Sequence, residues 1–214
     1  MNAIELKNVK ICYKKRLLFD DLNIVVPKGT IVRLVGPNGS GKSSILKVIS
    51  GLKRPEEGTV AIDEHTLKKG EFATDTGIII NSPKFISNLT GFQNLLALSR
   101  INKKITEDDI KVWMARVGLD PDLPQKVKGY SLGMTQKLAI CQALMEQPHI
   151  VLLDEPLNGL DKNSKEQIVD LIKNVRATTN TTFLIVSHDN YFDEITDIVY
   201  EINGERVEKI ADNK

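Results

Sequence analysis

A short glycine-rich segment with a single lysine is the part of the sequence whose composition points most directly to chemistry. It matches the pattern G-x-x-x-x-G-K-[ST] at every fixed position. In such a segment the glycines let the backbone curl until successive N–H groups point at phosphate oxygens, and the helix that follows adds its N-terminal dipole. The lysine brings a full positive charge to the β- and γ-phosphates, and the next hydroxyl is placed to ligate Mg²⁺. The predicted phosphate-binding residues are Gly36, Pro37, Asn38, Gly39, Ser40, Gly41, Lys42, Ser43 and Ser44.

An acidic pair, Asp154 and Glu155, ends the apolar run at residues 150–153. An apolar strand that delivers a carboxylate at its C-terminal end is the usual partner of a phosphate loop, where the aspartate orients Mg²⁺. Glu155 is then placed to polarise an attacking water. Taken alone, such a pair could simply cap the next helix. Together with the phosphate loop upstream, it predicts a Mg²⁺-dependent nucleoside triphosphatase.

The elements that must hold these residues can be read from the apolar pattern. Residues 4–35 are predicted to form strands, the last of which runs directly into the glycine-rich segment. Residues 84–146 have helical periodicity and no strand signal, and Thr106 is expected to cap one of their helices with Asp109 three residues later. Because strands otherwise alternate with helices, the chain is expected to be α/β with a mainly parallel sheet. Further strands are predicted at 59–63, 77–80, 149–156 and 181–188, helices after Gly41 and after Asp161, and a closing hairpin at 201–210 with Asn203-Gly204 at its tip.

Composition excludes several other classes of protein. The 214 residues are 41% hydrophobic and 27% charged, which is ordinary for a globular domain and argues against disorder or fibrous repeats. With 29 basic and 28 acidic residues the net charge is +1, so no overall field favours nucleic acid. No apolar run approaches the roughly 18 residues of a membrane span, and the N-terminus lacks a secretory signal. Cys12 and Cys141 are predicted to be core residues, as expected in the cytosol.

Several motifs occur in an order that resembles the nucleotide-binding subunits of ABC transporters. Residues 36–44 resemble that family's Walker A segment, 150–155 its Walker B segment and 158–161 its D-loop. Ser187-His188-Asp189 resembles its switch-histidine motif, and residues 130–134 lie where the LSGGQ signature should fall. The resemblance covers essentially the whole chain.

This resemblance implies a P-loop nucleoside triphosphatase of the RecA-like type. The implied fold has a mainly parallel sheet, an N-terminal antiparallel β subdomain and a helical insertion. The whole chain, 1–214, is expected to be one ATPase cassette. Residues 1–83 and 147–214 would form the catalytic core with its antiparallel part, and residues 84–146 the helical subdomain that carries the signature.

The resemblance also assigns roles around the nucleotide, with ATP and Mg²⁺ as cofactors. Tyr13 corresponds to an aromatic that stacks on adenine, although a tyrosine at a strand end is more often a packing residue. His188 corresponds to the histidine that contacts the γ-phosphate, and it joins Glu155 and Lys42 as a catalytic residue.

The signature segment departs from the family pattern at two positions. Leu132 replaces the first glycine and Met134 replaces glutamine, whereas Ser131 and Gly133 are kept. The resemblance implies that Ser131 and Gly133 bind the γ-phosphate held by an opposite subunit. The variant YSLGM resembles a subset of bacterial exporters of antimicrobial peptides and small toxic molecules. Asp161 is expected at the subunit interface, or as the cap of its own helix, and both can be true.

The metal site contains a third departure. Ser43, Asp154 and Asn81 are the predicted ligands of Mg²⁺, and Asn81 stands where the family has a glutamine with a longer reach. We therefore expect slow hydrolysis by the isolated subunit, below the roughly 10 s⁻¹ that is typical of enzymes.

The expected partners follow from the resemblance. Because the sequence lacks a membrane span, transport would need a separate transmembrane permease, and the chain would work as a homodimer or with a paralogous ATPase subunit, peripheral on the cytoplasmic face of the membrane. Residues 81–94, the docking segment, carry Phe85, Ile86 and Phe92 and would receive a coupling helix of the permease, or would merely form a loop that packs its own aromatics. The alternatives are a soluble ABC-type ATPase in protein or iron–sulfur cluster assembly, and a nucleotide-binding regulator without turnover. No nucleic-acid partner is expected.

Overall fold

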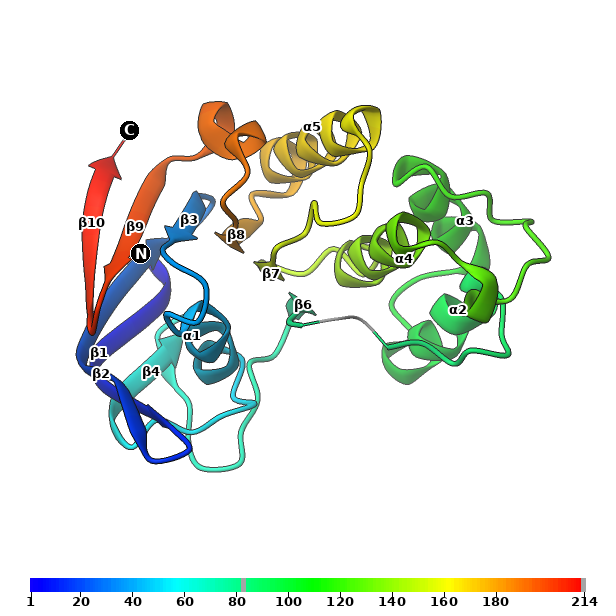
Figure 1. Cartoon of the computed structure of the whole chain (residues 1–214). Coiled ribbons are helices and arrows are strands. Elements are labelled where there is room, and N and C mark those ends of the chain that lie inside the picture. Colours follow the sequence, from blue (N-terminus) through cyan, green and yellow to red (C-terminus); the bar gives the residue numbers. More distant parts are fainter. Residues whose placement is uncertain (82–83, 213–214) are drawn as a thin grey trace.

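The computed structural model describes residues 1–81 and 84–212. Residues 82 and 83, which fall within the predicted docking segment, and residues 213 and 214 lie outside the described part. Two sheets occupy one side of the molecule, and a group of helices formed by residues 91–144 stands beside them (Figure 1). This arrangement agrees with the α/β fold expected from the sequence.

The first sheet is antiparallel and contains the N-terminal strands. Its strands occur in the order β2-β1-β4-β5. The long β1–β2 ladder pairs Tyr13 with Arg16 across a tight turn, so these two residues sit at the same end of the sheet. This sheet is the antiparallel β subdomain that the family resemblance implied. Its strands are β1 (Asn2–Tyr13), β2 (Arg16–Pro27), β4 (Glu57–Ile62) and β5 (His65–Thr66).

The second sheet has six strands in the order β10-β9-β3-β8-β7-β6. Every neighbouring pair is parallel except β9 and β10, which form the closing hairpin. All five residues of β8 and the first four of β7 are buried, as continuous apolar runs predict for central strands covered on both faces. The strands are β3 (Ile31–Val35), β6 (Thr76–Ile79), β7 (Ile150–Asp154), β8 (Thr182–Val186), β9 (Ile198–Asn203) and β10 (Arg206–Asp212).

Alternate residues of the central strands face two different cores. Leu152 and Leu184 pack in the core that the sheet shares with α1 (Lys42–Ile49) and the antiparallel sheet. Val151 and Phe183 point to the other face, toward α5 (Lys162–Thr179) and the helices at 91–144. The period of two along a strand therefore places the phosphate-loop helix on one face and the remaining helices on the other.

Among the described residues between β6 and β7, three α-helices and one 3₁₀ turn are present. Two of the helices begin with reciprocal caps: Thr90 accepts from the backbone N–H of Gln93, and Thr106 accepts from that of Asp109. The second of these confirms the cap predicted from the sequence. No helix in the described part of the chain is long and apolar enough to cross a membrane. The elements are α2 (Gly91–Asn102), α3 (Glu107–Arg116), η1 (Val127–Gly129) and α4 (Leu132–Leu144).

Two local predictions need correction. The hairpin tip is one residue further along than expected, because Asn203 still pairs with Arg206 and leaves Gly204 and Glu205 as the turn. Gly204 has a φ of 61°, the left-handed conformation that such turns require and glycine adopts freely.

Cys141 is a core residue, and burial raises the pKa of its thiol to about 12. Cys12, however, is only partly buried, so the prediction that both cysteines are core residues is wrong for it.

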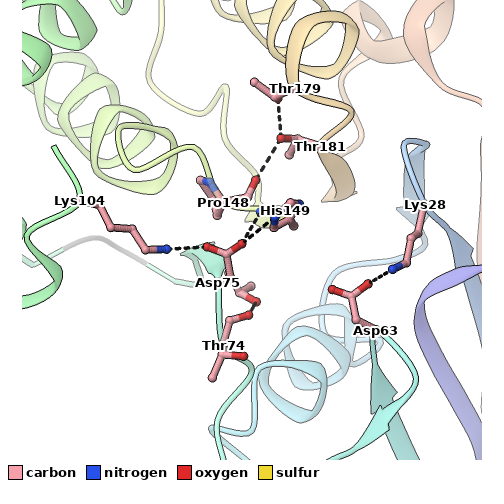
Figure 2. A network of polar contacts seen from close by, with 10 residues as sticks. Lys28, Asp63, Thr74, Asp75, Lys104, Pro148, His149, Thr179 and Thr181 are labelled. Carbon is pink, nitrogen blue, oxygen red and sulfur yellow. Dashed lines mark hydrogen bonds and ion pairs between the residues drawn. The ribbon is translucent and has the colours of Figure 1, made fainter.

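A polar network ties the helical segment to the edge of the sheet opposite the phosphate loop (Figure 2). Lys104, just beyond α2, pairs with Asp75 at 2.7 Å, and the other oxygen of Asp75 accepts from the backbone N–H of His149 at 3.3 Å. Burial by itself would raise the pKa of Asp75, but the hydrogen bonds from Lys104 and His149 outweigh it and hold the pKa below its usual value. The carboxylate therefore joins the connection between α2 and α3, and the chain just before β7, to the start of β6.

Substitution of Asp75 by asparagine should lower the melting temperature by about 1–4 °C at neutral pH, because the Asp75 carboxylate is partly buried and the chain is of moderate size. Asparagine tolerates the left-handed φ of 49° at this position, so only the charge is lost. Since the folded-state pKa is depressed, the stabilisation is present above the unfolded pKa of about 3.9 and disappears as the pH falls through the folded value. Thermal unfolding followed by circular dichroism between pH 3 and 7 should therefore show the melting temperatures of the unmodified chain and of Asp75→Asn approaching each other as the pH falls.

The matched control for this substitution is Asp63→Asn. Asp63 also has a positive φ and a lysine partner, Lys28 at 2.8 Å, but its side chain is 44% exposed. A loss at Asp63 as large as the loss at Asp75 would contradict a special role for the Lys104 pair.

Candidate nucleotide-binding and catalytic site

The predicted phosphate-binding segment forms the loop between β3 and α1, at the carboxyl edge of the parallel sheet. Two of its glycines are sterically required. A methyl carbon on Gly41, whose φ is 105°, would lie 2.7 Å from Cε2 of Phe19, and one on Gly36 would lie 2.8 Å from Cβ of Ile202. Larger residues at either position would push the loop away from the sheet.

The loop leaves several polar groups available to an anion. Helix α1 has no side-chain cap and no acidic residue in its first turn, so its first N–H groups lack the usual local partners. The hydroxyl oxygen of Ser40 is buried and has no hydrogen-bond partner within the described residues. Both features fit a bound phosphate, which would supply the missing acceptors.

Lys42 is folded back onto the loop that contains it. Its Nζ donates to the carbonyl oxygens of Gly36 at 2.6 Å and Pro37 at 2.9 Å, and the residue is only 7% exposed. Burial lowers the pKa of Lys42, while the negative charges of Glu155 and Asp154 oppose that shift. The ammonium is thus held by the carbonyls of its own loop, and the charges of the acidic pair favour its protonated form.

The predicted metal ligands Ser43 and Asp154 are in direct contact. Ser43 Oγ donates to Asp154 Oδ2 at 2.6 Å, although 111 residues separate them in the chain. β3 and β7 both end at this edge of the sheet, with β8 between them. A hydroxyl and a carboxylate oxygen are the hard donors that Mg²⁺ prefers, so the pair fits that ion.

Asn81 reaches this site through its backbone. Its N–H donates to the same oxygen of Asp154 at 3.5 Å, and its φ of 61° is left-handed. The residue is exposed, and its hydrogen bond to Asp154 involves the backbone and not the side-chain amide. Its role as a ligand stays a prediction.

Glu155 adopts an unusual backbone conformation beside His188. Its φ is 48°, and its N–H donates to the carbonyl of Val186 at the end of β8, at 2.8 Å. The carboxylate lies 3.9 Å from Nε2 of His188. Burial raises the pKa of Glu155, and the Asp154 charge adds to this, while His188 and Lys42 oppose it. A carboxylate with a raised pKa is a stronger base, as general-base chemistry requires.

A cavity of about 340 Å³ adjoins the phosphate loop and was not expected from the sequence. Arg16, Leu18 and the hairpin tip at Gly204-Glu205 form its walls together with residues of the loop. Tyr13 is the ladder partner of Arg16, and its ring is 55% exposed, with the Nζ atoms of Lys14 and Lys53 at 5.6 and 5.9 Å from its centroid. The ring is available for stacking at the same end of the sheet, although it does not line the cavity itself.

Ser131 and Asp161 both cap helices. Ser131 Oγ accepts from the N–H of Met134 at 3.1 Å, and Asp161 accepts from the N–H of Ser164 at 3.0 Å, a bond that also lowers the pKa of Asp161. Both residues are exposed, and Ser131 opens α4, which stands apart from α1 (Figure 1). The structure therefore does not bring Ser131 to the phosphate loop of its own chain.

The fold and the loop define a class of protein, the P-loop nucleoside triphosphatases. Its features here are a mainly parallel sheet, a glycine-rich loop between β3 and α1, and a carboxylate at the end of β7 in contact with the loop hydroxyl. Within that class, the family model described as ABC transporter matches residues 19–158. The chain belongs to the ABC transporter family, as an ATPase cassette.

Individual relatives agree with this assignment. An uncharacterised ABC transporter ATP-binding protein of Bacillus subtilis strain 168, YybJ, is 36% identical over 96% of this chain and 94% of its own length. The bacitracin transport ATP-binding protein BcrA of Enterococcus faecalis is 33% identical over 97% of this chain and 69% of its own. A solved dimer of the ATP-binding cassette MJ0796, in a post-hydrolysis state with ADP and Pi, superposes with a TM-score of 0.86 at 25% identity, covering 97% of this chain and 99% of that one.

Proposed function

We propose that this ATPase hydrolyses ATP with Mg²⁺ at the loop described above and thereby drives a separate membrane-spanning permease, in the direction of export. The observation that carries the proposal is the convergence of Ser43, Asp154 and Glu155 beside the buried ammonium of Lys42. A purely nucleotide-binding regulator would not need a partly buried carboxylate with a raised pKa next to its phosphate loop.

Binding of ATP would exchange partners within the loop. Lys42 Nζ would leave the carbonyls of Gly36 and Pro37 and turn to the β- and γ-phosphates, while the N–H groups at the start of α1 donate to them. Ser43 and Asp154 would hold Mg²⁺, which offsets the phosphate charge when it is bound. The cavity next to Arg16 would take the nucleoside, with Tyr13 at its edge.

Hydrolysis would depend on Glu155 and His188. Glu155 would accept a proton from the attacking water, which its raised pKa favours. His188, 3.9 Å from that carboxylate, would contact the γ-phosphate through its ring N–H and keep the glutamate oriented.

The second phosphate contact would come from another subunit. Ser131 is exposed at the start of α4 and cannot serve its own loop, which supports a dimer in which each Ser131 and Gly133 face the partner's nucleotide. The dimeric state of the cassette MJ0796 with ADP and Pi supports a dimer as the working form. Closure on ATP and opening after hydrolysis would be the mechanical step. The partner could be an identical chain or a paralogue.

The docking segment supports contact with a permease on the cytoplasmic face of the membrane. Ile86 is 59% exposed, whereas Phe85 and Phe92 are partly buried against the core of the helical segment. Among the described residues of this segment, Ile86 is therefore the large apolar side chain that is exposed, whereas the two aromatics pack against that core. Export is supported by the YSLGM sequence together with the likeness to BcrA, a bacitracin transport protein.

Substitution of Ile86 by aspartate should reduce recovery of a permease at least about fivefold, because it places a charge in an apolar contact. The tagged chain would be purified from detergent-solubilised membranes with MgATP, and the recovered polypeptides identified by mass. Ile101→Asp is the matched control, since Ile101 is 74% exposed at the end of α2, outside the docking segment.

A multi-span protein in stoichiometric amount, lost in Ile86→Asp and kept in Ile101→Asp, would support the proposal. Recovery of soluble partners alone would favour the alternative, a soluble ABC-type ATPase of protein or iron–sulfur cluster assembly. Equal recovery with both variants would remove Ile86 from the docking surface.

A further inference from the structure

The loop that follows Glu155 is packed tightly against the first turns of α4. This loop, residues 156–161, connects β7 to α5 and is called here the post-β7 loop. Gln136, on the second turn of α4, is 6% exposed, and its Nε2 donates to the carbonyl oxygen of Pro156 at 3.0 Å in a buried environment. Within the described residues this is the one side-chain hydrogen bond between α4 and the loop.

Backbone contacts reinforce this bond. A methyl carbon on Gly133 would lie 2.9 Å from the carbonyl oxygen of Gly159, and one on Gly159 would lie 2.6 Å from Cγ of Leu132. The side chain of Leu132, which is 69% exposed, thus covers Gly159 directly. The start of α4 and the post-β7 loop are therefore in direct contact, so a displacement of either one would press on the other.

Glu155, the residue just before this loop, has a strained backbone conformation. Glu155 is held at a φ of 48°, which is costly for a residue with a side chain and persists only where the surroundings fix it. Its N–H is held by Val186 and its carbonyl accepts from the N–H of Asn158 at 3.2 Å. The next carbonyl, that of Pro156, is held by Gln136. Without this donor a buried carbonyl would lack a partner, and the loop would rotate to find one.

We propose that Gln136 is a positioning residue: by holding the Pro156 carbonyl, it fixes the backbone of Glu155 and joins it to α4. Helix α4 is capped by Ser131, the proposed contact for a nucleotide on another subunit. Movement of α4 when Ser131 engages that nucleotide is therefore carried to Glu155 of the same chain. The inference rests on the proposed role of Glu155 as the group that activates water.

The first test is Gln136→Met, which keeps the size of the side chain and removes the donor. We expect kcat for MgATP to fall at least tenfold, with KM for ATP within twofold of the unmodified chain, because the phosphate loop is untouched. Gln142→Met, the same change on the same helix at a partly buried residue without a described hydrogen bond, should leave both constants unchanged. Circular dichroism at the assay temperature would verify that each variant is folded.

A double-mutant cycle separates positioning from general weakening of the fold. If Gln136 acts through Glu155, single-turnover hydrolysis by Glu155→Gln should not fall further when Gln136→Met is added. If instead the fold reductions in rate caused by the two substitutions multiply, Gln136 acts independently of Glu155 and the inference is wrong. Should Gln136→Met not fold, Gln136→Asn, whose amide is one methylene too short to reach Pro156, gives the same test.

The failure of the inference can be told apart from failure of the proposed function. If Glu155→Gln hydrolyses ATP as fast as the unmodified chain, the role assigned to Glu155 falls and the inference falls with it. If Glu155→Gln is inactive while Gln136→Met retains full kcat, only the inference is overturned.

Discussion

Glu155→Gln should bind MgATP as tightly as the unmodified chain and lower hydrolysis by roughly 10²–10⁴-fold, the usual contribution of a general base. Glutamine keeps the size of the side chain but cannot accept a proton from water. ATP would then remain bound and hold two subunits together, so light scattering with excess MgATP should show twice the monomer mass.

Loss of folding would not explain such a result. Burial raises the pKa of Glu155, which means that the charged carboxylate destabilises the folded state at neutral pH. Because glutamine is uncharged, the substitution should not lower the melting temperature. Glu208→Gln, on the exposed face of β10, is the control and should hydrolyse normally. A Glu155→Gln chain that stays monomeric with MgATP would contradict the homodimer, and one that hydrolyses at the normal rate would contradict the role of Glu155.

The parts of the site that could be predicted are those fixed by local rules. The glycines of the phosphate loop are dictated by backbone conformation, so their spacing identifies the loop before any tertiary structure is known. The Asp154–Ser43 contact could be expected because parallel strands deliver their ends to one edge of a sheet. Helix caps such as Thr106 involve only neighbours in sequence, and for that reason they were also correct.

Features that depend on distant segments could not be predicted in the same way. Arg16 lines a cavity only because the hairpin tip at Gly204 folds beside the phosphate loop, 188 positions further along the chain (204 − 16). Gln136 has nothing in its immediate sequence to distinguish it from Gln142 on the same helix, and the carbonyl it holds belongs to another element. The same reason explains Cys12, whose apolar neighbours suggested burial although a strand at that position leaves it partly exposed.

Lys42→Met should weaken MgATP binding about 10–100-fold, the value of a charge-assisted contact to phosphate. The fold should be retained, since burial lowers the pKa of Lys42 and its charge therefore costs stability that an apolar side chain does not. Lys47→Met, in the last turn of the same helix, changes the net charge equally and should bind normally. Equilibrium titration with a fluorescent ATP analogue would measure the three affinities.

The affinities of the unmodified chain, Lys42→Met and Lys47→Met together show which groups bind the phosphates. If the affinity of Lys42→Met for MgATP is within threefold of that of the unmodified chain, the loop N–H groups and the start of α1 are sufficient to bind the phosphates. The ammonium then only stabilises the loop through the carbonyls of Gly36 and Pro37. If both lysine variants weaken binding equally, the effect is one of overall charge, and raising the salt concentration should remove it. A loss confined to Lys42→Met, and persistent at high salt, is the result expected for a buried ammonium that turns from its own loop to the nucleotide.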